Sequence, residues 1–560
     1  MNAIALVAIG AGAFTLGYLF YSKFLAEKVF KLDPNFVTPA HAQEDGVDYV
    51  PTRKVILWGH HFAAVAGASP IVGPALAVAW GWLPAFLWIV VGTVFFAGVH
   101  DYGALWASVR NRGQSIGTLT EAIVGKRARS IFLVVIFLLL LMVNSVFGII
   151  IANEHIEVPS SVIPTWIVIL VAMLMGVAVY KKGMPLLWLT VIGVVVLYGA
   201  IGLGQVAPIS LPDSFLGLPT SSQWVVILFI YAGIASILPV WLLLQPRDYL
   251  NGVQLFVGLA LLYGAVIVSS PTIVAPAINP NPPADAPPLF PLLFVTVACG
   301  AISGFHGLVA SGTTSKQLDR EPDARPVGYL GSVGEGTLAI AAVIACTAGF
   351  ATLGEWQTYY TSFAGADGLR AWSLGGAAIM NRGLGLPLGV GETLLATMAI
   401  LFAATTMDAG VRLQRYIVQE WGQIYNIPAL TGRNVSTLIA VGTCLLLAFG
   451  AGAGGGGALI IWPLFGTSNQ LLAALTLMVL TVFLIKLRRP ILPVVIPLLF
   501  VLVVTIPALI LQLGNFWRAE NYLLVFMDLV ILGASLMVLL EAVAAFGRAR
   551  KEVASGAATA

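Results

Sequence analysis

The chain has 560 residues, of which 59% are hydrophobic and only 9% are charged, with a formal net charge of +3. Soluble domains carry about 25% charged residues, so the composition excludes a soluble globular protein and predicts an all-α polytopic membrane protein. The cysteines Cys299, Cys346 and Cys444 are scattered and form neither a disulfide framework nor a metal-thiolate motif.

About fifteen apolar segments are long enough to cross a bilayer. They run approximately over residues 2–22, 55–80, 83–108, 130–151, 161–180, 185–203, 224–244, 252–270, 291–312, 327–353, 389–410, 434–450, 457–486, 491–513 and 521–545. Lys and Arg fall on alternate loops, which places the N-terminus outside and the C-terminus inside. We therefore expect a single transporter domain over 1–545 and a cytoplasmic tail over 546–560, with the lipid bilayer and no nucleic acid as partner.

The second segment, from Trp58 to Trp80, contains two histidines, three glycines and two prolines. Pro70 and Pro74 lack an amide hydrogen and clash with the preceding turn, so the helix should break near Gly67–Pro74. Unpaired backbone at membrane depth is tolerated only where it is buried in protein or lines a watery cavity. A broken helix of this kind indicates the binding site of a transporter.

The seventh segment repeats this pattern, because Ala232–Pro239 has the same small residues, serine and proline as Ala66–Pro70. The charge pattern gives the two segments opposite orientations, which predicts a site between two interrupted helices of inverted halves. The alternative is plain helix packing by small residues. The expected substrate-binding residues are Ala66, Gly67, Ala68, Ser69, Gly233, Ser236, Ser311, Thr313 and Thr314.

Ionisable residues inside the apolar segments are costly and therefore candidates for function. His61, His100, Asp101 and His306 can change protonation at physiological pH, and an Asp beside a His holds the imidazole tautomer. We expect these four to couple transport to protons. Structural roles stay open, since Asp101 can instead orient Arg110 or backbone.

Other polar groups have further candidate roles. Glu335 and Glu392 stand near predicted helix starts, where they either cap the helix or serve function. Asp408 precedes Arg412 by one helical turn, a spacing at which the two can pair as a structural link or a gate. Asn469 and Gln470 are expected to hold helices together. If sodium replaces the proton, its expected ligands are Ala64, Gly67, Thr313 and Thr314.

Four long motifs are similar to those of one known family, the carbon starvation protein A (CstA) family, over about residues 1–545. They are GHHFAAVAGASPIVGPALAVAWGWLP, FAGVHDYGALWASVRNRGQSIG, CGAISGFHGLVASGTTSKQLDRE and WPLFGTSNQLLAALTL. The resemblance implies an inner-membrane secondary transporter of peptides or pyruvate, with proton coupling for the pyruvate members. It also implies a leucine-transporter-type fold of two inverted five-helix repeats, here about 55–203 and 224–410, with accessory spans over 434–545.

We therefore expect a symporter that imports small carboxylates or peptides with protons, or alternatively with sodium, and that has no cofactor. No G-x-x-x-x-G-K-[ST] motif is present, so ATP is not its energy source. A less favoured alternative is an intramembrane metal or redox enzyme that uses His60, His61, His100 and His306. It lacks the paired histidines, carboxylates and thiols that such sites need.

Overall fold

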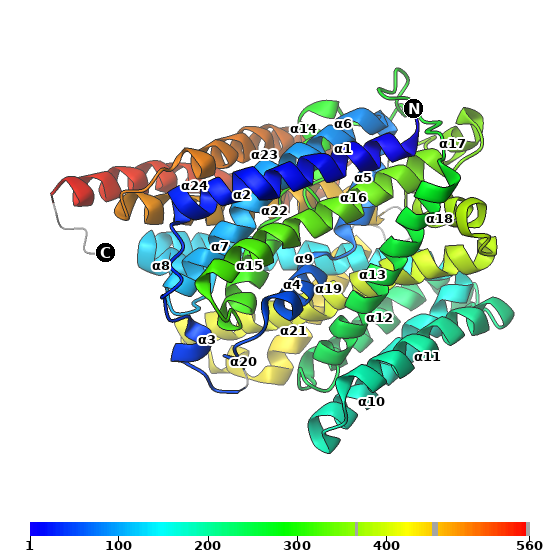
Figure 1. Ribbon diagram of the computed structural model, residues 1–560, viewed down its shortest axis with the longest axis horizontal. Coiled ribbons are helices and arrows are strands. Elements are labelled where there is room, and N and C mark those ends of the chain that lie inside the picture. Colours follow the sequence, from blue (N-terminus) through cyan, green and yellow to red (C-terminus); the bar gives the residue numbers. More distant parts are fainter. Residues whose placement is uncertain (47, 364–367, 451–456, 556–560) are drawn as a thin grey trace.

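The computed structural model describes residues 1–46, 48–363, 368–450 and 457–555. In these ranges the chain is mostly helical, and Figure 1 shows long helices that run side by side along one direction. The strands are the short antiparallel pair β1 (Ser214–Phe215) and β2 (Leu218–Pro219). In the first half the helices are α1 (Ala3–Leu16), α2 (Ser22–Phe24), α3 (Pro39–Ala42), α4 (Lys54–Val65), α5 (Ser69–Ala77), α6 (Trp82–Gly92), α7 (Gly98–Arg110), α8 (Ile116–Ile123), α9 (Lys126–Glu157), α10 (Val162–Lys182), α11 (Leu186–Val206), α12 (Thr220–Ile237) and α13 (Leu244–Ser269).

The second half begins with two short helices and ends with long ones. Its helices are α14 (Leu289–Thr296), α15 (Gly304–Gly312), α16 (Leu330–Ala348), α17 (Leu353–Tyr359), α18 (Gly368–Leu384), α19 (Leu388–Ile424), α20 (Pro428–Thr431), α21 (Arg433–Gly450), α22 (Gly457–Lys486), α23 (Leu492–Arg518) and α24 (Tyr522–Ala554). Short 3-10 or π-helical turns extend several of them. The last helix extends to Ala554, so the expected tail over 546–560 is helical up to that residue.

Thirteen helices in the described ranges are long and apolar enough to cross a membrane, or fourteen spans if the bent pair α4–α5 counts as one. The expected segment 291–312 is the remaining one of the fifteen. It consists of α14 and α15, which are separated by residues 297–303 and are each too short to cross a bilayer alone.

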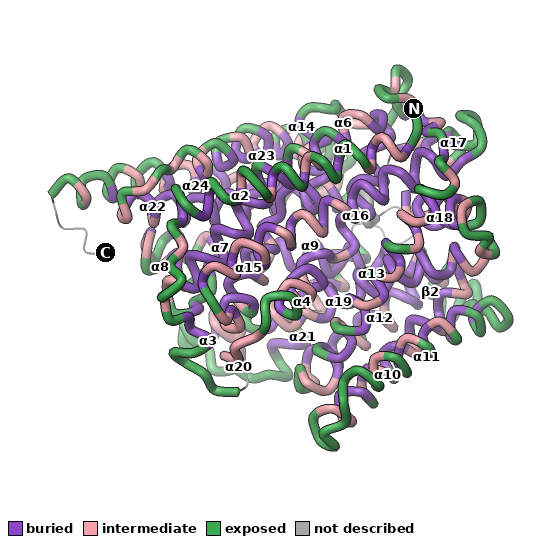
Figure 2. Tube along the Cα trace, in the orientation of Figure 1, coloured by how far each residue is buried: buried purple, intermediate pink, exposed green. Residues whose placement is uncertain are grey.

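The centre of the protein is formed by α9, α19 and α22, around which the other helices pack (Figure 2). In the most apolar stretches of α19 and α22, 94% of the residues are buried inside the protein, against 28% in α11. Leu187, Val195 and Val206 of α11 are exposed. Apolar residues that face outward along a spanning helix are typical of contact with lipid.

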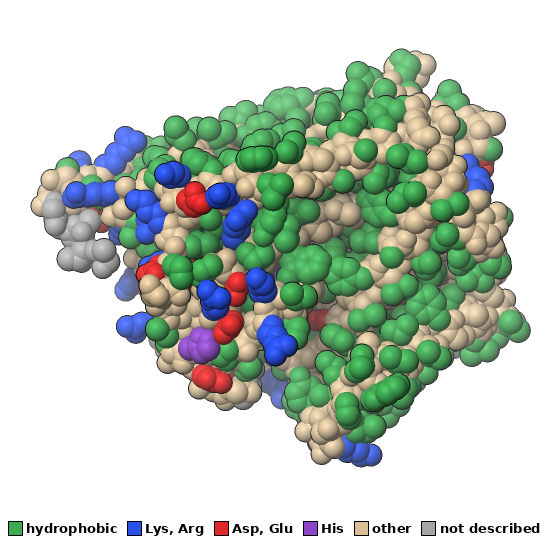
Figure 3. Space-filling model, in the orientation of Figure 1, with side chains coloured by type: hydrophobic (Ala, Val, Ile, Leu, Met, Phe, Trp, Pro, Cys, Tyr) green, Lys and Arg blue, Asp and Glu red, His purple; other side chains and the backbone are tan. Residues whose placement is uncertain are grey.

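Lys and Arg side chains gather at one end of the face shown in Figure 3, the end at which α24 and the C-terminus lie. Hydrophobic side chains cover most of the remaining face. This distribution is the one expected of an elongated bundle whose long axis crosses the membrane.

Candidate functional site

The second span is broken, as the sequence predicted. The helix α4 ends at Val65, α5 begins at Ser69, and their axes are bent by 53°. Pro70 lies in the first turn of α5, where its missing amide costs no helical hydrogen bond. The residues between the two helices are fully or mostly buried, so their backbone is available to a ligand inside the protein rather than to lipid.

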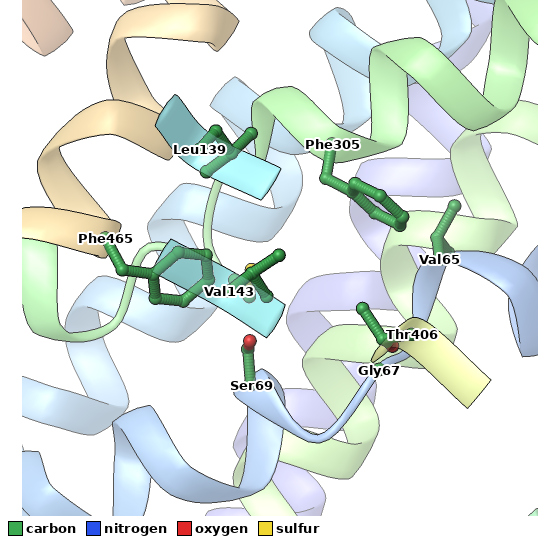
Figure 4. A pocket seen from close by; sticks show the side chains of 9 residues that line it. Val65, Gly67, Ser69, Leu139, Val143, Phe305, Thr406 and Phe465 are labelled. Atoms are coloured by element: carbon green, nitrogen blue, oxygen red, sulfur yellow. The ribbon is translucent and has the colours of Figure 1, made fainter. Parts of the chain in front are cut away.

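The break faces a small cavity at the centre of the bundle (Figure 4). Its volume is about 20 Å³, which is room for about one water molecule. The lining combines apolar side chains with a few polar groups and comes from five parts of the chain: Val65, Gly67, Ser69, Leu139, Val143, Cys299, Phe305, Thr406 and Phe465. A substrate larger than water therefore needs side chains such as Leu139 or Phe305 to move.

Gly67, in the break between α4 and α5, packs closely against Thr406 of α19. A Cβ atom added at Gly67 would lie 2.7 Å from Oγ1 of Thr406, closer than real side chains approach one another. Thr406 in turn donates a hydrogen bond to the carbonyl of Phe402 at 3.0 Å. The glycine is thus required here for close packing between two elements that both line the cavity.

The partner of the broken second span is a second broken span, α14–α15. The backbone of Thr52, just before α4, hydrogen-bonds to the carbonyl of Gln317, just after α15, at 3.0 Å. At the opposite end, the indole of Trp80 donates to the carbonyl of Pro287 at 3.0 Å. The two broken spans therefore lie side by side and run in opposite directions.

Two side chains of α22 hydrogen-bond to backbone groups on either side of the break between α14 and α15. The amide oxygen of Asn469 accepts from the backbone N–H of Phe305 at 3.1 Å, and Gln470 donates to the carbonyl of Phe294 at 2.7 Å. Both amides thus join helices, as the sequence predicted, and they do so by satisfying backbone groups that the break exposes.

A buried polar network lies beside the cavity. Asp101 is its centre: His100 Nδ1 lies 2.7 Å from one carboxylate oxygen, and His306 Nδ1 lies 2.8 Å from the other. Ser332 donates to the same second oxygen at 2.5 Å. Since an ionised carboxylate only accepts, both imidazoles present N–H groups to it. His306 Nε2 lies 3.1 Å from a carboxylate oxygen of Glu335, and all of these side chains are buried.

His61 belongs to the same region. It is buried, its Nδ1 lies 2.9 Å from the hydroxyl of Thr314, and its ring packs against Gly331. The neighbouring His60 is half-buried. The structure thus brings together all four residues that the sequence assigned to proton coupling. In the described ranges it contains no group of three His, Cys, Asp or Glu side chains placed to hold a metal ion.

The expected substrate residues are only partly brought together. Gly67 and Ser69 line the cavity, and Ala66 and Ala68 belong to the same break. Ser311 is a helix-packing residue instead, because its hydroxyl donates to the carbonyl of Gly307 and accepts from the N–H of Ile116. Thr313 is exposed and donates to the carbonyl of Val309.

The prediction of a break within the seventh span is wrong. The helix α12 is regular up to Ile237, and Pro239 follows its end, which is a common place for proline. A Cβ atom at Gly233 would face Val441 of α21, and Ser236 donates to the carbonyl of Gly233 at 2.8 Å. Neither residue lines the cavity.

The expected pair of Asp408 and Arg412 is also not formed. Asp408 is bonded to Arg247 of α13 and accepts from the Tyr231 hydroxyl at 2.7 Å. Arg412 instead donates to the carbonyls of Ala235 and Leu238, at the C-terminal end of α12. Carbonyl groups at a helix C-terminus lack helical partners and lie at the negative end of the helix dipole, which favours a cation there.

Sequence reasoning left the role of Glu335 open between a cap and a function, and it missed Thr406 and Arg247. Glu335 lies inside α16 and is not a cap, because the helical turn over 325–329 precedes that helix. Thr406 gave no signal, since threonines are common in membrane helices. Arg247 could have been recognised, because a lone arginine near an apolar segment is costly and needs a partner. Its partner Asp408 could not, since it lies 161 residues away in the sequence.

The chain is similar to one protein family and to several individual proteins. The family model described as "Carbon starvation protein CstA" matches residues 2–352 and 349–508. The peptide transporter CstA of Campylobacter jejuni is 35% identical, over 90% of this chain and 80% of that protein. The pyruvate/proton symporter BtsT of Escherichia coli is 32% identical, over 93% of this chain and 84% of that protein. Among solved structures, a manganese transporter of Eremococcus coleocola aligns with a TM-score of 0.47 at 13% identity, over 88% of this chain and 96% of that one.

Proposed function

This chain belongs to the carbon starvation protein CstA family of inner-membrane transporters, and on that premise we propose that it imports pyruvate or peptides by proton symport. One observation carries the proposal: Phe305 and His306 are neighbours on α15, and Phe305 lines the cavity while His306 belongs to the buried polar network. A movement of this one helix therefore acts on both sites.

The cavity is suited to a carboxylate. The helices α5 and α15 both begin at the breaks that face it, at Ser69 and Gly304. The positive end of the helix dipole at each N-terminus favours an anion. The N–H of Phe305 already donates to Asn469, and those of Ile71 and Val72 donate to the carbonyl of Ala68. Pyruvate and peptides share a carboxylate, which explains how one family can include transporters of both.

The polar network is suited to a proton. Asp101 links two imidazoles in an interior shielded from water, and histidine is the side chain that titrates at physiological pH. Sodium has less support: of its four expected ligands, Thr314 is bonded to His61, and Thr313 is exposed just after the end of α15.

We further propose one transmembrane domain over 1–545 with a leucine-transporter-type pair of inverted repeats. The second repeat is better placed over 289–486 than over 224–410. This placement is supported by the antiparallel contact of α4–α5 with α14–α15 and by the central packing of α9 against α19. The accessory helices are then α1, α12, α13, α23 and α24, and Asp408 remains a gate candidate with Arg247 as its partner.

The test is uptake by the purified protein in liposomes. Labelled pyruvate and labelled dialanine are supplied outside while either a proton gradient or a sodium gradient is imposed. We expect the proton gradient alone to drive accumulation of at least one of them. Accumulation only with sodium overturns the coupling ion, and accumulation of neither compound under any gradient overturns the transport function.

A further inference from the structure

The residue Glu335 lies between the polar network and the segment that lines the cavity. On one side, its carboxylate is 3.1 Å from His306 Nε2. On the other side, it interacts with the backbone of Gly300 in the segment 297–303. A Cβ atom at Gly300 would lie 3.0 Å from Ala339 Cβ, one turn beyond Glu335 on α16, so this segment packs directly on α16.

The same segment reaches the cavity. Cys299, next to Gly300, is one of the cavity-lining residues. It is held by Asn469, whose amide donates to the sulfur at 3.1 Å, and it lies beside Ser303 at 3.4 Å. The chain therefore connects Glu335 to the cavity through two adjacent residues, without an intervening helix.

The number of protons in the network is constrained. Asp101 lies 2.7 and 2.8 Å from the two imidazoles and accepts from Ser332, and an ionised carboxylate satisfies all three contacts as acceptor. His306 Nε2 lies 3.1 Å from an oxygen of Glu335, but this nitrogen has no partner in hydrogen-bond geometry in the described chain. At this distance an imidazolium and a carboxylate attract each other, so one proton on the pair is favoured. With one proton there, the set of Asp101, His100, His306 and Glu335 carries one net negative charge. A second proton makes the set neutral.

The second proton has a place to bind. Oε1 of Glu335 is buried and has no hydrogen-bond partner in the part of the chain that the structure describes. An unpaired buried charge is costly, so a neutral carboxylic acid beside an imidazolium is favoured when protons are plentiful. Asp101 is less suited, because all three of its contacts require it to accept.

Among the other titratable or charged groups on elements packed against α16, His61 Nε2, His100 Nε2 and the Tyr102 hydroxyl are buried without a hydrogen-bond partner in the described chain. A proton on either imidazole nitrogen would add a buried charge, whereas a proton on the Glu335 carboxylate removes one.

Four further side chains on the elements packed on α16 have partners. Tyr263 donates to the carbonyl of Thr337, and Tyr329 donates to the carbonyl of Val94. Arg382 donates to the carbonyls of Ala348 and Gly349, and Arg325 donates to Ser22 and to the carbonyl of Tyr18. The helices α1, α5 and α6 contain no titratable side chain.

We infer that the transported proton binds to Glu335, next to His306. Protonation of Glu335 then changes the position of residues 297–303, and through them the substrate cavity. The inference rests on the proposed function. The proton arrives from outside and turns the Glu335 carboxylate into a carboxylic acid. It leaves to the inside after the substrate, which restores the carboxylate and the negative charge of the set.

The test compares wild type, Glu335→Gln and Glu355→Gln in liposomes, with whichever of labelled pyruvate and dialanine the wild type accumulates. Glutamine mimics the neutral acid and cannot release a proton. A gradient of one pH unit supports at most about tenfold accumulation per proton. We expect Glu335→Gln to reach no accumulation, to keep counterflow exchange at a reduced rate, and to lose the pH dependence of exchange that the wild type shows between pH 5.5 and 8.5. Glu355, exposed on α17, is the matched control and should accumulate like wild type.

The outcomes separate the two hypotheses. If the wild type accumulates and Glu335→Gln does too, or if Glu335→Gln keeps the pH dependence of exchange, the inference is overturned while the transport function stands. If Glu335→Gln loses exchange as well, Glu335 serves folding or binding and the inference is again overturned. Failure of the wild type itself overturns the proposed function and the inference with it.

Discussion

At the scale of single residues, the site depends on neighbours in sequence that face different partners. On α15, Phe305 contacts the cavity and His306 contacts Asp101. On α7, by contrast, the neighbours His100 and Asp101 bond to each other at 2.7 Å, and Asp101 also contacts His306 and Ser332. Because adjacent residues of a helix point about 100° apart, one helix can serve the substrate and the proton at the same time.

Replacing Asp101 with Asn should separate transport from coupling. Asparagine keeps the shape, but its NH₂ group cannot accept from an imidazole N–H or from Ser332, so the proton network loses its centre. We expect gradient-driven accumulation to disappear while counterflow exchange persists in part. Uptake into liposomes under a proton gradient measures this, and normal accumulation by the variant would show that Asp101 is structural.

Replacing Gly67 with Ala should impair transport by crowding Thr406. The new methyl group would lie 2.7 Å from Oγ1 of Thr406, and overpacking of this kind typically costs about 1–3 kcal/mol. We expect uptake to fall by roughly five- to 150-fold, since 1.4 kcal/mol is about a factor of ten. The double variant Gly67→Ala/Thr406→Ala removes the clashing oxygen and should recover part of the loss. Gly59→Ala is the control, because its added Cβ meets nothing within 4 Å; equal effects at both glycines would contradict the prediction.

At the scale of elements, arginines fasten the end of α12. Arg412 and Arg415 donate to carbonyls of Ala235, Ser236 and Leu238. Arg247 of α13 is fully buried and joins Asp408 of α19 and Tyr231 of α12. Three helices thus meet at one buried ion pair.

Removing one partner of that ion pair should destabilise the protein strongly. Arg247→Met leaves Asp408 buried without its cation, and breaking a buried pair costs about 3–5 kcal/mol. We expect a clear drop in the thermal unfolding midpoint in detergent. The double variant Arg247→Met/Asp408→Asn removes both charges, keeps an acceptor for Tyr231, and should recover most of the stability.

An exposed ion pair provides the matched control for this experiment. Lys23 and Glu27 are 3.8 Å apart, with side chains 60% and 56% exposed, and exposed pairs contribute about 0–1 kcal/mol. Lys23→Met should therefore leave the midpoint almost unchanged. A drop equal to that of Arg247→Met would mean that the loss of any arginine or lysine, rather than of a buried partner, is being measured.

At the scale of the whole molecule, the protein is a buried centre inside a lipid-facing shell. The central spans α9, α19 and α22 carry side chains for the cavity, whereas α10, α11, α23 and α24 leave long apolar rows exposed. The basic side chains gather at one end (Figure 3). This asymmetry orients the bundle in the membrane.

The orientation can be tested by labelling single cysteines in cells. The native cysteines are all buried and are replaced with alanine to give a background without thiols. Asp213→Cys, exposed after α11, should react with an impermeant maleimide in intact spheroplasts. Ser555→Cys, exposed after α24, should react only after permeabilisation. The reverse pattern would contradict an external N-terminus and an internal C-terminus.

The sequence alone determined the features that depend on local chemistry. Hydropathy identified the membrane class and the apolar segments. Pro70 and Pro74 predicted a break near Gly67–Pro74; the break lies between Val65 and Ser69, and Pro74 is inside α5. The cost of burying ionisable groups identified His61, His100, Asp101 and His306. The four motifs identified the family, which the family match confirms. Each of these signals is contained within a few turns of helix.

Only the tertiary structure decided which elements meet. The small-residue pattern pointed to α12 as partner of the first break, but α14–α15 occupies that place. The spacing of Asp408 and Arg412 predicted a pair, but Arg247 and the α12 carbonyls bind them instead. Glu335 reached His306 only through the packing of α16 on α15 and α7. Pairings between distant segments depend on how whole helix faces fit together, and a helix in lipid has several apolar faces that are equally able to pack.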